Sequence, residues 1–418
     1  MTAIPHTSEF DLTASVLREG YLALPRRRQE LGSDVFRSRL LLYPVIVMAG
    51  EKAARVFYEP GAFSRQGAMP QSVVKLLQDH GSVQTLDDAA HRVRKQMFLR
   101  MMTPTALEDL AICFSRRWAE RSIQWEARER IVLFDEVRPI LCATACDWSG
   151  IPSERYALEP LSDELSAMIE YVGTLGWQHW QARRGRRRAE RWAADLVADV
   201  RVGEVDPPAE SALSIIAHHQ DADGRSLTSE VAAVELLNVL RPIVAVARYV
   251  VFAAHALHVS GSGTNINSSD SVLEAFAHEV RRAYPFFPAI GGRARHDVDW
   301  NDNRIVAGSW VLFDLHGTNH DPAIWPDPDV FRLERFLDWD DDPYRLVPQG
   351  GGYVETNHRC PGERVTMVLI KTAVRELVAT DYTVPHQDLS IDLGEMPALP
   401  KSGFVVTGVR RRKAVTDA

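Results

Sequence analysis

The stretch Pro348-Gln-Gly-Gly-Gly-Tyr-Val-Glu-Thr-Asn-His-Arg-Cys-Pro-Gly-Glu363 decides the fold class of this sequence. It leads through three consecutive glycines to a single cysteine, Cys360, and then into the apolar, helix-like segment Val365 to Val378. A cysteine at the mouth of a helix lies near exposed backbone N–H groups and a favourable dipole, which lower the pKa of its thiol. The pattern therefore predicts a thiolate at Cys360.

Two roles are open for Cys360 at this point. A lone cysteine before a helix is more often a buried structural residue. A thiolate in the same place would suit haem iron as an axial ligand, since its sulfur donates electron density that favours O–O bond cleavage. Gly350 to Gly352 do not predict a phosphate loop, because no Gly-Lys-Ser/Thr follows them, and a chain passing close to a haem explains them better.

Two further patterns lie upstream of the cysteine. Glu279 and Arg282 are spaced i and i+3 on a predicted helix, where they form either a buried ion pair or a surface pair that contributes little. After them, an irregular stretch rich in Asp, Pro and Trp, His316 to Arg335, leads through Phe331 to Phe336 toward the cysteine loop.

Taken together, Glu279-Val-Arg-Arg282, Phe331 to Phe336 and Cys360-Pro-Gly362 resemble the ExxR motif, the meander and the cysteine loop of the cytochrome P450 superfamily, in that order. The resemblance implies one mainly α-helical domain with a small β contribution over residues 1–418. It also implies that this domain encloses haem b (iron protoporphyrin IX), with Cys360 as the fifth iron ligand. The cysteine loop departs from the family in lacking Phe-x-x-Gly and in carrying Asn357 where a glycine often stands.

An arginine replaces the usual polar residues of the helix that crosses the haem in that superfamily. The family commonly has an acid followed by threonine there, whereas this chain reads Glu235-Leu-Leu-Asn-Val-Leu-Arg241-Pro242-Ile-Val-Ala245. Pro242 removes a helical hydrogen bond and is expected to bend the axis. An arginine in apolar surroundings needs an anion, and its planar fork matches a carboxylate. Either the protein or a ligand supplies that partner.

The Arg241-Pro242 pair resembles the fatty-acid peroxygenase branch of the superfamily, and other stretches agree with this narrower match: Arg55 to Tyr58 with Arg65-Gln66, Gln84 with Asp87-Asp88 and His91, Phe98 to Pro104, and Pro400 to Phe404. The resemblance implies an oxidoreductase that uses hydrogen peroxide, without a reductase, to hydroxylate a fatty acid at the α or β carbon. It implies catalytic roles for Arg241, Pro242 and Gln84, with the substrate carboxylate on Arg241 acting as general acid-base.

Gln84 bears on the product. In the peroxygenases a glutamine at this position is associated with hydroxylation and a histidine with decarboxylation to a terminal alkene, so the resemblance favours hydroxylation. An ordinary loop side chain is the alternative for Gln84. For the enzyme as a whole, the alternatives are a decarboxylase, a monooxygenase that depends on redox partners, and a haem protein that binds or senses a ligand without turnover.

The same resemblance assigns cofactor-binding roles to Arg65, His91 and Lys95, which match the basic groups that hold the haem propionates. Each could equally be an exposed charge. The loop Gln78-Asp-His-Gly81 is more polar than a channel for a long alkyl chain should be, so it leaves the preferred chain length open.

Composition narrows the class of protein. The chain has 418 residues, 45% hydrophobic and 25% charged, with a net charge of -8, so a globular protein without a nucleic-acid surface is expected. One basic run, Arg183 to Arg188, is predicted to be the solvated face of a helix, with a docking patch as the alternative.

Met1 to Tyr21 lacks the continuous apolar core of a secretory signal, and Ile243 to Leu257 is too short to span a bilayer comfortably. We therefore expect a cytoplasmic protein that does not enter a membrane.

Four cysteines without a regular framework make disulfides improbable, and Cys142 and Cys146 are expected to pack in the core.

Apolar periodicity predicts a mostly helical fold. The predicted helices are Asp88 to Leu99, Leu107 to Glu126, Ala189 to Val200, Ser229 to His258 and Val272 to Tyr284, and the predicted strands are Leu41 to Met48 and Ile305 to Leu315.

Overall fold

The computed structural model describes residues 4–79, 81–174, 176–261, 266, 269–301 and 303–411. Helices dominate the described residues. The longer ones are α2 (Ala23–Leu31), α5 (Asp88–Met101), α6 (Pro104–Trp125), α7 (Leu133–Trp148), α8 (Leu158–Glu170), α9 (Trp177–Val202), α11 (Ser229–Ala245), α12 (Ala247–Ser260), α13 (Asp270–Ala283) and α15 (Glu363–Val378). The short ones are α1 (Thr13–Glu19), η1 (Gly20–Leu22), α3 (Glu51–Phe57), α4 (Gln71–Val73), η2 (Val74–Gln78), η3 (Val83–Thr85), η4 (Ser153–Arg155), α10 (Ala212–Ala217), α14 (Leu315–Asn319) and η6 (Leu333–Phe336).

The described strands form three sheets. The five-stranded sheet has the order β1 (Val35–Leu40), β2 (Tyr43–Met48), β8 (Trp310–Asp314), β5 (Ala289–Ala294), β3 (Phe63–Ser64). In this sheet β2 and β8 are parallel, with Val47 facing Leu312, and the other neighbours are antiparallel. The smaller sheets have the orders β4 (Ile131–Val132), β10 (Val405–Arg411), β9 (Thr380–Thr383) and β6 (Val298–Trp300), β7 (Asn303–Ile305).

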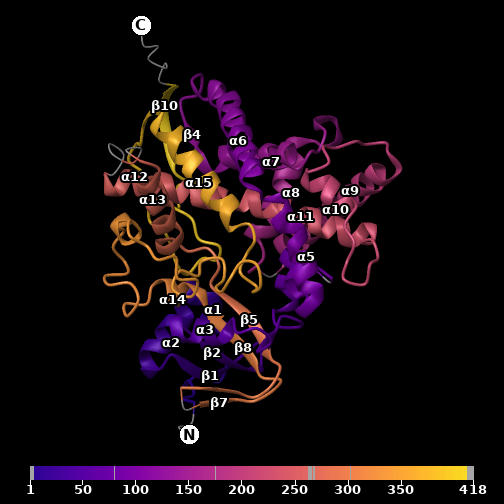
Figure 1. The fold of residues 1–418 in the computed structure, drawn as a ribbon. Coiled ribbons are helices and arrows are strands. Elements are labelled where there is room, and N and C mark those ends of the chain that lie inside the picture. Colours follow the sequence, from indigo (N-terminus) through magenta and orange to yellow (C-terminus); the bar gives the residue numbers. More distant parts are fainter. Residues whose placement is uncertain are drawn as a thin grey trace.

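Figure 1 shows the five-stranded sheet at one end of the molecule, beside the N-terminal helices, and the long helices at the other end. Helix α11 lies among α7, α8, α9 and α10, and α15 packs against α6, α12 and α13. Nearly every side chain of α11 is buried, because the helix is apolar on all sides and neighbours surround it. The polar side chains of Glu235, Asn238 and Arg241, beyond the first turn of α11, therefore lie in the interior of the protein.

The predicted helices are confirmed, with shifted ends. The largest shift is in α9, which begins at Trp177, twelve positions before the predicted Ala189, because its arginine-rich first half hides the apolar period. The predicted helix over residues 229–258 is divided at Val246 into α11 and α12, four residues after Pro242. The basic run was only partly predicted, since Arg186 is buried rather than solvated.

The strand predictions were less complete. The segment 41–48 contains β2 and 305–315 contains β8, both rich in β-branched and aromatic residues. Strand β1 was missed because Arg37 and Arg39 interrupt its apolar pattern, although it pairs along its whole length with β2.

Several smaller predictions are confirmed. All four cysteines are free, and Cys142 and Cys146 are fully buried in the largest core cluster. One helical run in the described residues, Ser229–Ser260, is long and apolar enough to cross a bilayer, and 94% of its most apolar window is buried inside the protein. It is thus longer than the stretch 243–257 singled out in the sequence, and its burial is that of a core helix.

Candidate active site

The cysteine loop is held by main-chain and side-chain hydrogen bonds. The N–H of Cys360 donates to the carbonyl oxygen of Gln349 at 3.0 Å, and α15 begins three residues later at Glu363. Asn357, the residue that departs from the family pattern, donates through its amide to the carbonyl of Tyr58 and accepts from the N–H of Tyr353 at 2.9 Å. The asparagine therefore closes the loop with its side chain.

The glycines before the loop are required by protein contacts rather than by a haem alone. Gly350 and Gly352 have φ values of 95° and 83°, which favour glycine. A Cβ on Gly352 would lie 2.7 Å from the side chain of Asn357, and one on Gly350 would lie 3.2 Å from the hydroxyl of Tyr58.

The buried ion pair predicted at Glu279 and Arg282 is confirmed and supports the segment before the loop. The two side chains form a two-point contact at 2.7 and 2.8 Å, and neither is exposed. Arg282 also donates to the carbonyl of Asn319, whose side chain accepts from the N–H of Val347. Since Glu279 accepts from the N–H of Arg332 at 2.8 Å, the pair joins α13 to two separate parts of the chain that leads to Cys360.

The prediction of a lowered thiol pKa at Cys360 was wrong for the protein chain alone. Burial raises the pKa of Cys360, and the N–H of Gly362 and the charges of Lys95 and Arg281 oppose this only in part. The helix N-terminus lowers the thiol pKa by less than the loss of hydration raises it. A metal cation bound to the sulfur would instead lower the pKa of the thiol, because a thiol that coordinates a metal is deprotonated outright.

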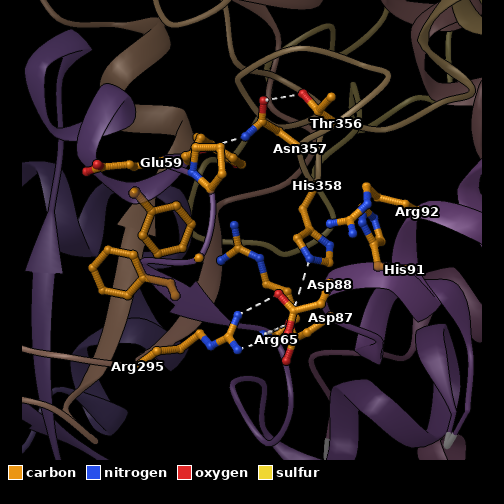
Figure 2. A pocket seen from close by; sticks show the side chains of 15 residues that line it. Glu59, Arg65, Asp87, Asp88, His91, Arg92, Arg295, Thr356, Asn357 and His358 are labelled. Atoms are coloured by element: carbon orange, nitrogen blue, oxygen red, sulfur yellow. Dashed lines mark hydrogen bonds and ion pairs between the residues drawn. The ribbon is translucent and has the colours of Figure 1, made fainter.

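Basic side chains gather beside the loop in the pocket of Figure 2. The rings of His91 and His358 stack at 3.9 Å, and both point into this region together with Arg65. Arg65 is buried against the ring of Phe57 and donates to the carbonyl of Gly291 at 2.8 Å. The alternative of exposed charges is therefore excluded for Arg65 and His91, which are 7% and 5% exposed.

Lys95 lies deeper than these two residues. It is 1% exposed and its ammonium group donates to the carbonyls of Asn357 and Arg359, in the segment that leads directly to Cys360. Burial lowers its pKa to about 8, with Cys360 acting in the opposite direction. Lys95 thus holds the cysteine loop directly.

This set of residues fits haem. The buried Nε of Arg65 and hydroxyl of Tyr58 have no hydrogen-bond partner among the described residues. Burial and neighbouring positive charges lower the pKa of His91 to about 4, and burial lowers the pKa of His358 well below its usual range. Carboxylates placed here would accept hydrogen bonds from Arg65 and Tyr58 and would favour the protonated forms of the two histidines. Haem propionates are such carboxylates, and Cys360 provides a sulfur for the iron.

Arg241 is the second centre of the site. It is 5% exposed on α11, and it donates to the side-chain oxygen of Asn238 at 3.0 Å and to the carbonyl of Leu76 at 3.4 Å. No carboxylate among the described residues lies within ion-pair distance of its guanidinium group. Burial lowers the pKa of Arg241 to about 9, aided by the positive charge of Arg186. The side chain is a buried cation that the described part of the chain does not neutralise by direct contact.

A hydrogen-bonded network connects Arg241 to Gln84. Asn238 donates to Glu235 at 2.8 Å and to the side-chain oxygen of Gln84 at 3.2 Å. Glu235, which is fully buried, also accepts from Arg94 at 2.5 Å and from the N–H of Val83 at 2.8 Å. The structure therefore brings Arg241 and Gln84 together through one shared asparagine.

Three members of this network were not predicted as site residues. Asn238 and Glu235 are polar residues on an otherwise apolar helix, which was the available signal. Arg94 gave no such signal, because its partner Glu235 lies 141 residues away in the sequence. For Pro242 the structure shows a position within α11 and a break in the helix at Val246.

Comparison with known proteins extends these observations. A family model described as Cytochrome P450 matches residues 271–384. Among curated proteins, dimethylnonatriene synthase of Arabidopsis thaliana is 30% identical over 152 residues, and a 3-beta-hydroxylase of Tanacetum parthenium is 36% identical over 120. These matches span 29% and 23% of the relatives' own lengths.

Solved structures match nearly the whole chain. A variant of cytochrome P450SP alpha (CYP152B1) has 41% identity and a TM-score of 0.93, covering 96% of this chain and 100% of its own. Cytochrome P450EX alpha (CYP152N1) with myristic acid has 39% identity and a TM-score of 0.94, covering 99% and 100%. A variant of cytochrome P450 OleT in complex with arachidonic acid has 33% identity and a TM-score of 0.95, with the same coverage.

Proposed function

Because the chain belongs to the cytochrome P450 superfamily, within its CYP152 family of fatty-acid peroxygenases, we propose that it uses hydrogen peroxide to hydroxylate a fatty acid beside the carboxyl group. One oxygen atom of the peroxide enters a C–H bond and the other leaves as water. Residues 1–418 form one haem domain of this cytoplasmic enzyme, which needs no reductase. Two solved relatives with bound fatty acids, myristic acid and arachidonic acid, support this substrate class.

Haem b, bound through Cys360, supplies the activation of peroxide and the oxidation of the C–H bond. The residues Arg65, His91 and Lys95 hold its propionates or the loop that carries its ligand. The geometry that supports this assignment is the buried basic cluster beside the cysteine loop, where the Arg65 Nε and the Tyr58 hydroxyl have no partner among the described residues.

The observation that carries the proposal is the buried guanidinium of Arg241, with which no described carboxylate forms an ion pair. A fatty-acid carboxylate bound there satisfies the buried cation with two charge-assisted hydrogen bonds. It also fixes the carbon atoms next to the carboxyl group at one place in the site, which determines where the chain is oxidised. The carboxylate then holds and returns the proton that peroxide cleavage requires, a task for which α11 has no threonine.

Asn238 and Gln84 position the guanidinium group that would bind the substrate carboxylate. Asn238 orients the guanidinium of Arg241 through its oxygen and holds Gln84 through its nitrogen. A neutral amide at residue 84 donates and accepts hydrogen bonds without titrating. Because the resemblance associates glutamine at this position with hydroxylation and histidine with decarboxylation, we propose hydroxylation as the main reaction.

The test is product analysis. Haem-loaded protein is mixed with myristic acid and hydrogen peroxide, without reductase, and the products are separated by gas chromatography. We expect 2- or 3-hydroxytetradecanoic acid to dominate. A terminal alkene as the main product would identify a decarboxylase instead, and turnover only with a ferredoxin and its reductase would identify a conventional monooxygenase.

Arg241→Ala tests the role of the arginine in the same assay. The variant should bind haem and unfold at a similar temperature, but its kcat/KM should fall by about a hundredfold, as expected when a charge-assisted anchor is lost. Arg187→Ala, an exposed arginine on α9, is the matched control and should leave kcat/KM unchanged. Unchanged turnover in Arg241→Ala would contradict the assignment.

A further inference from the structure

A second buried arginine lies near Arg241. Arg186 on α9 is 2% exposed, and its Nε donates to Glu190 at 2.6 Å. Its two terminal nitrogens, Nη1 and Nη2, have no hydrogen-bond partner among the described residues, and a carboxylate oxygen of Asp79 is 3.7 Å from Nη2. Most of the hydrogen-bonding capacity of a buried cation is therefore unused.

Both arginines border the same short element, η2. Arg241 contacts the carbonyl of Leu76 within η2, and Arg186 approaches Asp79, which directly follows it. The helices that carry the two arginines, α9 and α11, pack against each other and against η2, and Figure 1 shows them side by side. The two guanidinium groups are close enough for the charge of Arg186 to lower the pKa of Arg241.

The backbone at Asp79 is strained. Element η2 is a single π-helical turn, closed by a hydrogen bond of 2.7 Å from the N–H of Asp79 to the carbonyl of Val74. Asp79 has φ 69° and ψ 165°, a conformation that is ordinarily restricted to glycine. Strained residues and π-helical turns are concentrated at functional sites. Here the strain places a carboxyl group beside Arg186, and burial together with this neighbouring carboxyl group raises the pKa of Glu190.

Arg186, Glu190 and Asp79 thus form a polar cluster at the end of η2, the element whose Leu76 carbonyl Arg241 contacts. An alkyl chain anchored at Arg241 and running along η2 would meet this cluster. An entirely apolar chain would leave Nη1 and Nη2 of Arg186 without partners, which is costly for a buried guanidinium. An oxygen atom on the chain would satisfy them. The cluster already contains two carboxyl groups for one guanidinium, so a neutral oxygen suits it better than a third carboxylate would.

We propose that Arg186, with Glu190 and Asp79, forms a second binding subsite for a neutral oxygen-bearing group on the chain of the acid whose carboxylate Arg241 holds. The preferred substrates of this enzyme are then hydroxy or oxo fatty acids, and plain saturated acids are poorer substrates. The inference rests on the proposed function, because it takes the carboxylate on Arg241 as the fixed end of the substrate. It also gives a reason for the polar segment Gln78-Asp79, where a channel for an alkyl chain would be apolar.

Haem-loaded wild-type protein tests this with acids of equal length. Myristic acid, a set of tetradecanoic acids with one hydroxyl or keto group at different positions beyond carbon 4, and tetradecanedioic acid are each supplied with hydrogen peroxide, and binding is measured in parallel by calorimetry. At least one hydroxy or keto acid should exceed myristic acid in kcat/KM by about tenfold, the effect of one hydrogen bond to a charged group. The diacid should show no such gain.

The variant Arg186→Met locates the effect. It removes the charge and keeps most of the side-chain length, so it should reduce the preference for the oxygen-bearing acid to about one while myristic acid is still oxidised. Arg187→Met, on the exposed side of the same helix, is the matched control and should keep the preference. If Arg186→Met does not fold, the wild-type series alone decides.

The outcomes separate the two proposals. Myristic acid turned over at least as well as every oxygen-bearing acid would overturn the subsite and leave the peroxygenase function intact. A preference for the diacid would also overturn it, since the subsite would then bind an anion. Failure of all the acids to bind or react would overturn the proposed function, and the subsite with it.

Discussion

Arg241 and Arg282 are both buried arginines, but different groups neutralise them. Arg282 has a two-point ion pair with Glu279 inside the protein, and neither side chain is exposed. Arg241 has only neutral partners among the described residues, the side chain of Asn238 and the carbonyl of Leu76. A buried cation without a counter-ion is costly, so its retention points to a ligand that supplies the charge. The two environments distinguish an arginine that the protein neutralises from one that has no counter-ion in direct contact among the described residues.

Asp314 is a carboxyl group whose charged form is disfavoured by burial, as the charge of Arg241 is. Its titration should make the stability of the protein depend on pH. The side chain is buried before α14, where one oxygen accepts from the N–H of Gly317 at 2.7 Å and the other has no partner among the described residues. Burial raises the pKa of Asp314 to about 7 from 3.8. Between these values the folded protein keeps a proton that the unfolded chain has released, so the free energy of unfolding falls as the pH rises through this window.

Asp314→Asn should remove that dependence. The amide keeps an oxygen for the N–H of Gly317 and does not titrate, so the variant should gain stability relative to wild type as the pH rises from about 4 to 7. The gain levels off above pH 7 and is at most about 4 kcal/mol, at roughly 1.36 kcal/mol per pKa unit. Urea unfolding at several pH values measures it. A difference between the two proteins that does not vary with pH would contradict the assignment.

Residue type and spacing drew attention to Cys360, Arg241 and the Glu279–Arg282 pair, and the family resemblance supplied the roles expected of Cys360 and Arg241. Of these expectations, the structure confirms the buried ion pair. The pKa of Cys360 could not be predicted, because it depends on how much water the folded chain removes. Arg186 was placed on a solvated face, since five arginines in six positions gave no indication of which one turns inward.

At the scale of elements, α13 and α15 form the support of the cysteine loop. Glu279 and Arg282 on α13 hold backbone groups of residues 319 and 332, and Lys371 on α15 pairs with Glu274 at 3.3 Å on the exposed side of α13. The two acidic residues share one helix and differ in burial. Glu279 and Glu274 therefore allow the contribution of a buried ion pair to stability to be compared with that of an exposed one.

Glu279→Gln should destabilise the protein strongly. It leaves Arg282 charged and without a counter-ion in the interior, and breaking a buried pair in this way costs about 3–5 kcal/mol. Glu274→Gln removes an ion pair whose carboxylate is 53% exposed and should cost less than about 1 kcal/mol. Urea unfolding followed by circular dichroism compares them. Equal losses in the two variants would show that the ExxR pair has no special structural role.

The elements themselves were predicted unevenly. Long helices with an apolar face, such as α5, α6 and α13, were predicted because their apolar residues recur with the helical period of 3.6 residues. Strand β1 was missed because its burial comes from pairing with β2, a contact that its own residues do not encode. The division of the predicted helix at Val246 follows Pro242, but its position could not be read from the proline alone.

At the scale of the whole molecule, the site is assembled from segments far apart in the sequence. The cysteine loop near residue 360 is held by Lys95 of α5, and Arg241 of α11 is linked to residue 84 through Asn238. No periodicity reveals such contacts, which is why the network of Arg94, Glu235 and Asn238 was not predicted. The family resemblance supplied the overall arrangement, and the structure supplied the connections.

This assembly makes stability depend on the cofactor. Arg65 and His91 are buried, His358 is half-buried, and the carboxylate of Asp87 lies beside them. The buried Nε of Arg65 nevertheless has no partner among the described residues, so removing haem should leave buried polar groups unsatisfied. Haem at a thousand times its dissociation constant would stabilise the folded state by about 4.1 kcal/mol. The apoprotein should therefore unfold at a temperature several degrees lower than the holoprotein. Equal melting temperatures in differential scanning calorimetry would contradict the assignment of this cluster to the haem.

The most direct test of a carboxylate bound at Arg241 is a binding cycle with two ligands and two proteins. Decanoic acid and decan-1-ol are titrated by calorimetry at pH 7.5 into haem-loaded wild type and Arg241→Ala. Wild type should prefer the acid by roughly 10- to 100-fold, as expected for hydrogen bonds between charged groups, and the variant should bind the two ligands about equally. A variant that keeps the full preference for the acid would show that the carboxylate binds elsewhere.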